Sequence, residues 1–81
     1  MDVLDNKMLN IIKIRTNLVH QVLQNKTSKK QIVDKNRINL ILKNIKKKSI
    51  KKKLDVKLTQ NIWSNMIKAY IDFEYRKFKK K

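Results

Sequence analysis

Apolar residues recur every three or four positions along most of the chain, which is the spacing of an α-helix. In the first third of the sequence this line consists of Leu4, Met8, Ile11, Leu18 and Val22. It predicts a helix over about residues 2–26, roughly 37 Å long. Two other helices of so short a chain cannot cover that length within one compact monomer. The pattern therefore predicts that a partner chain packs along the first helix.

Two further helices are predicted beyond the first. The polar segment 27–31 interrupts the apolar line and predicts a loop. Asp34 precedes a second helical pattern over about residues 34–52, and Asp55 precedes a third over about residues 56–78. Acidic residues are favoured at the start of a helix by its dipole. With no glycine or proline to form hairpin turns, the chain is predicted to be all-α, as one three-helix domain over residues 1–81.

The composition excludes several kinds of site. The chain has no glycine, so it cannot form a glycine-rich phosphate loop. It has no cysteine, which excludes disulfides, a thiol nucleophile and a zinc–thiolate site. The single histidine, His20, cannot build a poly-histidine metal site, and we expect it at the surface or in an interface. No cofactor and no metal are therefore predicted.

The net charge of +16 on 81 residues points first to a polyanionic partner, either nucleic acid or an anionic membrane. Lysine, asparagine and isoleucine are all abundant, however, as the codon bias of an AT-rich genome would produce. Much of the lysine excess can thus be ordinary solvated surface. No apolar run reaches membrane-spanning length, and Asp2 and Asp5 are acidic where a secretory signal would be basic. We expect a cytoplasmic protein without membrane association.

A few polar residues interrupt the apolar lines. Arg15 and Lys26 each stand four residues after an apolar member of the first line. Arg37 lies at the edge of the second line, and Glu74 ends an apolar line in the third segment. A buried cation must be paired or must face an anion. These cations either extend outward along the stripe edges, with Glu74 pairing with one of them, or line a cationic pocket for a small polyanion.

The residues around these interruptions resemble those of the all-α chorismate mutases, in order and with nearly matching spacings, from residue 4 to about residue 78. The first helix of that family resembles Leu4-Asp5-x-x-Met8-Leu9-x-Ile11-Ile12-x-x-Arg15-x-x-Leu18-Val19-x-x-Val22-x-x-x-Lys26. The family's second helix opens in a similar way to Val33-Asp34-x-x-Arg37. Its third helix resembles Leu54-Asp55 followed by Ile62-Trp63-x-x-Met66-Ile67.

This resemblance implies an intertwined three-helix homodimer in which the long first helices pair. It implies the conversion of chorismate to prephenate, for phenylalanine and tyrosine biosynthesis, without a cofactor or a covalent intermediate. Chorismate is a dicarboxylate, so a cationic pocket suits it. Positioning and preorganised hydrogen-bond donors would lower the barrier.

The resemblance also implies roles for particular residues. Arg15 would pair with a substrate carboxylate, a task for which a bidentate guanidinium is suited. Lys26 would contact a carboxylate and the ether oxygen, whereas Asp34 and Arg37 would shape the hydroxyl and carboxylate end. Glu74 would donate to the ether oxygen, which a glutamate can do only when protonated.

The sequence departs from the family pattern at three positions. An arginine that usually lies near the start of the first helix, and reaches into the partner's site, would fall before Met1. The glutamate that usually binds the substrate hydroxyl is Ile38 here. Tyr70 takes a pocket-lining position that usually holds a small hydroxyl residue. Ile38 and Tyr70 are closer to the related isochorismate-pyruvate lyases, which share the fold and form salicylate and pyruvate.

Two alternative functions therefore stay open beside the mutase. The first is the isochorismate-pyruvate lyase activity. The second is a small basic helical protein that binds nucleic acid, for which the lysines of segment 46–53 could provide the contacts. That second alternative leaves Arg15 and Lys26 on the apolar line unexplained, so no specific nucleic-acid partner is expected.

Overall fold

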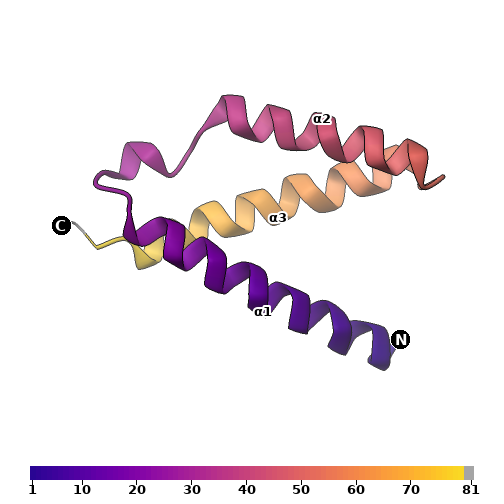
Figure 1. Ribbon diagram of the computed structural model, residues 1–81, viewed down its shortest axis with the longest axis horizontal. Coiled ribbons are helices and arrows are strands. Elements are labelled where there is room, and N and C mark those ends of the chain that lie inside the picture. Colours follow the sequence, from indigo (N-terminus) through magenta and orange to yellow (C-terminus); the bar gives the residue numbers. More distant parts are fainter. Residues whose placement is uncertain (80–81) are drawn as a thin grey trace.

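The computed structural model describes residues 1–79 and contains three α-helices in that range (Figure 1). Helix α1 spans Asp2–Gln24, α2 spans Lys35–Lys51 and α3 spans Val56–Lys77. A short 3-10 helix, η1, spans Lys29–Gln31. Because residues 1–79 contain no strand, the predicted all-α class is confirmed. No helix within those residues is long and apolar enough to cross a membrane.

The helix ends follow from local capping. α1 ends at Gln24, two residues before the predicted end, so Lys26 lies in the following loop. The Lys26 N–H still donates to the carbonyl of Leu23 at 3.0 Å, which tightens the last turn. The Asp34 carboxylate accepts from the backbone N–H of Arg37 at 3.1 Å and so caps α2. Asp55 caps α3 in the same way.

Helices α2 and α3 lie side by side as a hairpin (Figure 1). A buried hydrogen bond of 2.6 Å joins the hydroxyls of Ser49 and Thr59 near the turn. Further along, the side-chain amide of Gln60 donates to the carbonyl of Leu42 at 2.8 Å. Polar groups buried between helices are stabilising only when they are paired, and these bonds fix how the two helices sit against each other.

The turn between α2 and α3 uses a lysine in a conformation that favours glycine. Lys53 has φ 59°, in the left-handed region. The N–H of Leu54 donates to the carbonyl of Ser49 at 2.8 Å, and the N–H of Lys53 donates to that of Ile50 at 3.1 Å. Those two bonds form the Schellman motif, which closes a helix C-terminus. A non-glycine residue there has a conformational cost.

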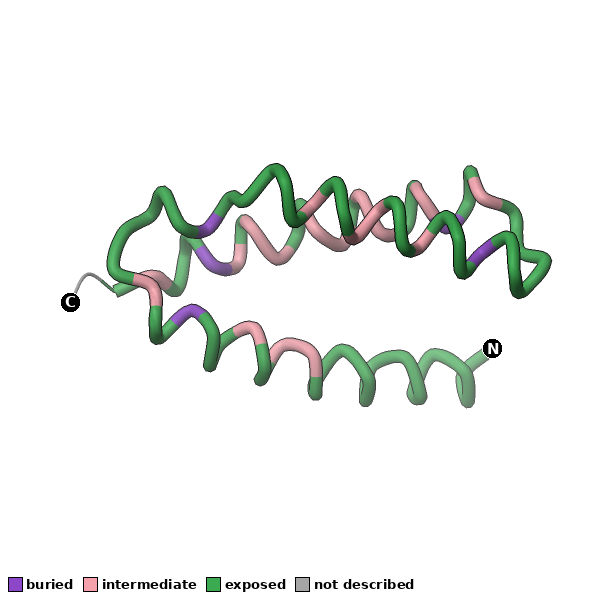
Figure 2. The backbone as a smooth tube through the Cα atoms, turned by 45° about the horizontal axis from the view of Figure 1, so that its top comes forward, coloured by how far each residue is buried: buried purple, intermediate pink, exposed green. Residues whose placement is uncertain are grey.

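Helix α1 contacts the hairpin from about its middle to its C-terminal end, and its first turns stand apart (Figures 1 and 2). Leu4, Met8 and Ile11 of the predicted apolar line are 57%, 58% and 63% exposed. Within the described residues the buried apolar side chains are those of Leu23 and Ile32. A single copy of the chain therefore leaves many of its large apolar side chains exposed.

The dimensions of the chain are those of an open arrangement. Its accessible surface is 7113 Å², whereas a compact monomer of this mass would expose about 5,200 Å². Its radius of gyration is 14.4 Å, against about 12 Å for a compact chain of this length. Part of this exposed surface lies on α1, whose N-terminal half is exposed throughout (Figure 2).

Candidate active site

A cavity of about 650 Å³ lies among the C-terminal half of α1, the loop with η1, the first half of α2 and the C-terminal half of α3. Every residue predicted for the site lines it, namely Arg15, Lys26, Asp34, Arg37, Ile38, Tyr70 and Glu74. Much of the remaining lining is aliphatic. The fold thus brings together polar groups that are far apart in the sequence and surrounds them with apolar side chains.

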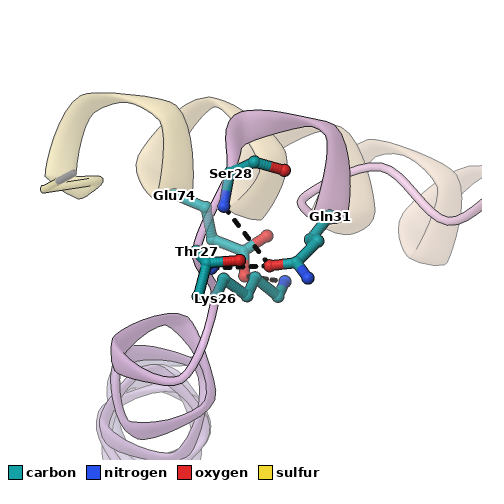
Figure 3. A network of polar contacts seen from close by, with 5 residues as sticks. All are labelled: Lys26, Thr27, Ser28, Gln31 and Glu74. Atoms are coloured by element: carbon teal, nitrogen blue, oxygen red, sulfur yellow. Dashed lines mark hydrogen bonds and ion pairs between the residues drawn. The ribbon is translucent and has the colours of Figure 1, made fainter. Parts of the chain in front are cut away.

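An ion pair joins the loop after α1 to helix α3 within this cavity. The ammonium of Lys26 donates to Oε1 of Glu74 at 3.0 Å (Figure 3). The Glu74 residue is buried and Lys26 is half-buried. The sequence left two interpretations open, an ion pair between Glu74 and a cation or a pocket lined by these residues. The structure contains a feature of each, because Glu74 pairs with Lys26 and both side chains line the cavity. The Lys26 ammonium has three N–H donors, of which the pair uses one.

Arg15 has a buried donor without a partner. Its Nε is buried and forms no hydrogen bond within residues 1–79. The guanidinium carbon lies 5.9 Å from the centre of the Tyr70 ring, a cation–π distance. Buried polar groups without a partner are rare and call for an explanation. An anionic ligand in the cavity would supply the missing acceptor.

Asp34 and Arg37 lie at the mouth of the cavity and are exposed. The Asp34 carboxylate serves as the cap of α2 through its bond to the Arg37 backbone. This bond holds the first turn of α2, and with it the Arg37 guanidinium, beside the cavity. The lining carries three cations, Arg15, Lys26 and Arg37, against two carboxylates. With Lys26 paired to Glu74, the two arginines give the cavity a preference for an anion.

Gln31 lines the cavity and was not among the predicted site residues. Its side-chain oxygen accepts from the backbone N–H of Thr27 at 2.6 Å and from that of Ser28 at 3.4 Å (Figure 3). The bonds order the loop that carries Lys26. A serine followed three residues later by glutamine is a helix-start signal, so the spacing of Ser28 and Gln31 could have identified η1.

Ile38 and His20 differ in their relation to the cavity. Ile38 is half-buried and places an aliphatic side chain on the cavity wall. His20 is exposed and is not among the lining residues. Among the described residues, no group of three or more His, Cys, Asp or Glu side chains is placed to hold a metal ion.

Comparison with models of protein families matches residues 1–75 to chorismate mutase type II. The match includes all the predicted site residues and all three helices except the end of α3. Searches of curated proteins and of solved structures gave no significant match.

Proposed function

Because the chain belongs to the chorismate mutase type II family, we propose that it converts chorismate to prephenate in the cavity between its three helices. The observation that carries this proposal is the buried, unpartnered Nε of Arg15 in a cavity that also contains Lys26 and Arg37. A cavity of about 650 Å³ is in the range of small-molecule sites. Arg15 and Arg37 form no ion pair within residues 1–79, and these two arginines match a substrate with two carboxylates.

The proposed reaction needs no group beyond those of the protein and the substrate. In this rearrangement the ether C–O bond breaks while a new C–C bond forms within the same molecule, so no atom is gained or lost. Arg15 and Arg37 hold the two carboxylates and favour the compact conformer that reacts, which lowers the entropic part of the barrier. A substrate seated against the aliphatic wall would displace water from that side, which strengthens the charge–charge interactions there.

Lys26 and Glu74 are the groups proposed to act on the breaking bond. Negative charge develops on the ether oxygen, and a preorganised ammonium stabilises it. The pair with Glu74 Oε1 at 3.0 Å holds the Lys26 side chain against α3 and leaves two N–H donors free. Glu74 Oε2 forms no hydrogen bond within residues 1–79. When Glu74 is protonated, that oxygen supplies a second donor to the ether oxygen.

The uncovered face of α1 supports a homodimer as the active form. The accessible surface exceeds that of a compact monomer by roughly 1,900 Å². Homodimer interfaces commonly bury at least 2,000 Å² in total, so an excess of this size on each chain suits one. The apolar line through Leu4, Met8 and Ile11 on α1 is the proposed contact surface.

Isochorismate-pyruvate lyase activity is the second candidate. The observation that favours it is that Ile38 and Tyr70 both line the cavity. These are the two positions at which the sequence resembles the lyases more than the mutases. The lyase would use the same arginines for the two carboxylates. The two activities differ in product, since the lyase would release salicylate and pyruvate.

Incubation with chorismate and with isochorismate, separately, tests both activities. Loss of the ultraviolet absorbance of chorismate together with prephenate in the product mixture would support the mutase. Salicylate from isochorismate would support the lyase. Arg15→Ala, checked for helix content by circular dichroism, controls for a contaminating enzyme and should lose most of the activity. No turnover of either compound would contradict both candidates.

The proposed cellular setting follows from the reaction. Prephenate is a precursor for phenylalanine and tyrosine biosynthesis, and we place the enzyme in the cytoplasm with that pathway. A nucleic-acid-binding role is less well supported. The lysines of segment 46–53 lie around the α2–α3 turn, at the opposite end of the hairpin from the cavity (Figure 1), and would not explain the cavity.

A further inference from the structure

The hydroxyl of Tyr70 is bound to α1. Tyr70 lies on α3, and its hydroxyl oxygen is 2.8 Å from the hydroxyl oxygen of Thr16, an ordinary O–H···O hydrogen-bond length in which either group can donate. The same hydroxyl makes a longer contact of 3.4 Å to the carbonyl of Ile12. Thr16 and Ile12 are one turn apart on α1. The phenol end of Tyr70 is thus held by one helical turn of the opposite helix.

The Tyr70 ring separates two hollows. On one side is the cavity of about 650 Å³ with Arg15 and Glu74. On the other is a smaller hollow of about 260 Å³, whose almost wholly apolar lining includes Ile12, Met66 and Phe73. Tyr70 lines both hollows and Arg15 only the first. The ring also meets the Phe73 ring edge-on, with centroids 6.3 Å apart, but it borders both hollows, so the hydroxyl bond adds to packing in fixing where the ring stands.

The same ring is the support for Arg15. The guanidinium carbon of Arg15 lies 5.9 Å from the ring centre, and Nε is buried without a hydrogen-bond partner in the part of the chain that the structure describes. A cation–π contact attracts the guanidinium without using its N–H donors. Arg15 is therefore steadied by an aromatic face, and its donors stay available for an anion.

From these contacts we propose that Thr16 is a positioning residue that acts through Tyr70. By holding the phenol hydroxyl, Thr16 fixes the ring as the wall of the cavity and as the face against which Arg15 is aimed. The inference rests on the proposed function for its kinetic consequence, but the arrangement of Thr16, Tyr70 and Arg15 can be measured without any substrate.

The test compares Thr16→Val, which keeps the shape of the side chain and removes the hydroxyl, with Tyr70→Phe, which removes the other partner. Each is expected to raise KM for chorismate about two- to tenfold, the size of one neutral hydrogen bond, and to lower kcat by a smaller factor, because Arg15 itself stays in the cavity. The double variant should be no worse than either single one, because both remove the same bond. Thr16→Ser keeps the hydroxyl and should have the same KM as the wild type.

Thr59→Val is the matched control. This substitution also removes a hydroxyl that is hydrogen-bonded between two helices, since the hydroxyl oxygens of Thr59 and Ser49 are 2.6 Å apart. Thr59 is not among the residues that line the cavity. It should lower stability without raising KM. An equal rise in KM for Thr59→Val would show that any loss of stability has this effect and would overturn the proposal.

A second measurement is independent of turnover. Hydrogen exchange of the Arg15 Nε–H with water, followed by NMR in the free protein, should be several-fold faster in Thr16→Val and Tyr70→Phe than in the wild type and Thr16→Ser. Unchanged exchange in both variants would overturn the positioning role even if chorismate is turned over. Faster exchange in a protein that does not turn over chorismate would leave the positioning role intact and refute the proposed function alone.

Discussion

The Lys26 ammonium and the Glu74 carboxylate are 3.0 Å apart in the free protein, so the group proposed to stabilise the ether oxygen already has an anionic partner. The pair joins the loop after α1 to α3 across 48 residues of sequence. It holds Lys26 in the cavity but also neutralises part of its charge. Protonation of Glu74 would remove that neutralisation and create a second donor.

Activity should therefore fall as pH rises, because deprotonated Glu74 cannot donate to the ether oxygen. The substitution Glu74→Gln supplies an amide N–H donor at every pH and should flatten this fall. Measuring kcat/KM from about pH 4 to 9 checks the prediction. His20→Gln, at an exposed position outside the cavity lining, should keep the wild-type slope. A Glu74→Gln enzyme that is weaker but has the same slope would assign Glu74 the role of a charged support for Lys26 only.

The proposed dimer predicts that Ile11→Glu produces a monomer. A glutamate carboxylate placed in an apolar interface would weaken association by on the order of 3 kcal/mol or more, more than a hundredfold in the dissociation constant. Sedimentation measures the change in mass. Ile50→Glu is the matched control, because Ile50 on the α2–α3 hairpin is 60% exposed and Ile11 is 63% exposed. Equal effects of the two substitutions, or a monomeric wild type, would argue against pairing through α1.

The left-handed conformation of Lys53, with φ 59°, predicts that Lys53→Gly stabilises the protein. Glycine adopts this conformation without a Cβ clash, so the free energy of unfolding should rise by about 1 kcal/mol. That corresponds to about 4–8 °C in the midpoint of thermal unfolding for a domain of this size. Lys53→Ala keeps the clash while removing the charge and should give no comparable gain. Equal stabilisation by both substitutions would point to relief of repulsion among the lysines instead.

The lysines around the α2–α3 turn are predicted to be dispensable for catalysis. They are exposed, and they form no ion pair within the described residues. Replacing Lys46, Lys47, Lys51 and Lys52 by glutamine should leave kcat/KM within about twofold, because none of them lines the cavity. Any binding of the wild type to duplex or single-stranded DNA should fall steeply with added salt. Sequence-selective binding that persists at moderate salt would revive the nucleic-acid alternative.

Helical periodicity was sufficient to predict the number, order and approximate extent of the helices. That Arg15 and Lys26 would line a cavity could be predicted because they interrupt an apolar line, where an unpaired charge is costly. The contact between Thr16 and Tyr70 was not predictable, since it depends on how α1 and α3 cross. Nor was the conformation of Lys53, because this chain has no glycine to mark a left-handed turn. Gln31 was missed although its spacing from Ser28 carried a capping signal.

The proposed mutase mechanism is tested most simply by identifying the product that the wild-type protein forms from chorismate, beside the same reaction with Lys26→Ala. We expect prephenate as the product and a loss of about 10²–10³-fold in kcat on removal of the ammonium that stabilises the ether oxygen, as this mechanism requires. Chorismate that stays unconverted by the folded wild-type protein, or is converted equally well by Lys26→Ala, would contradict it.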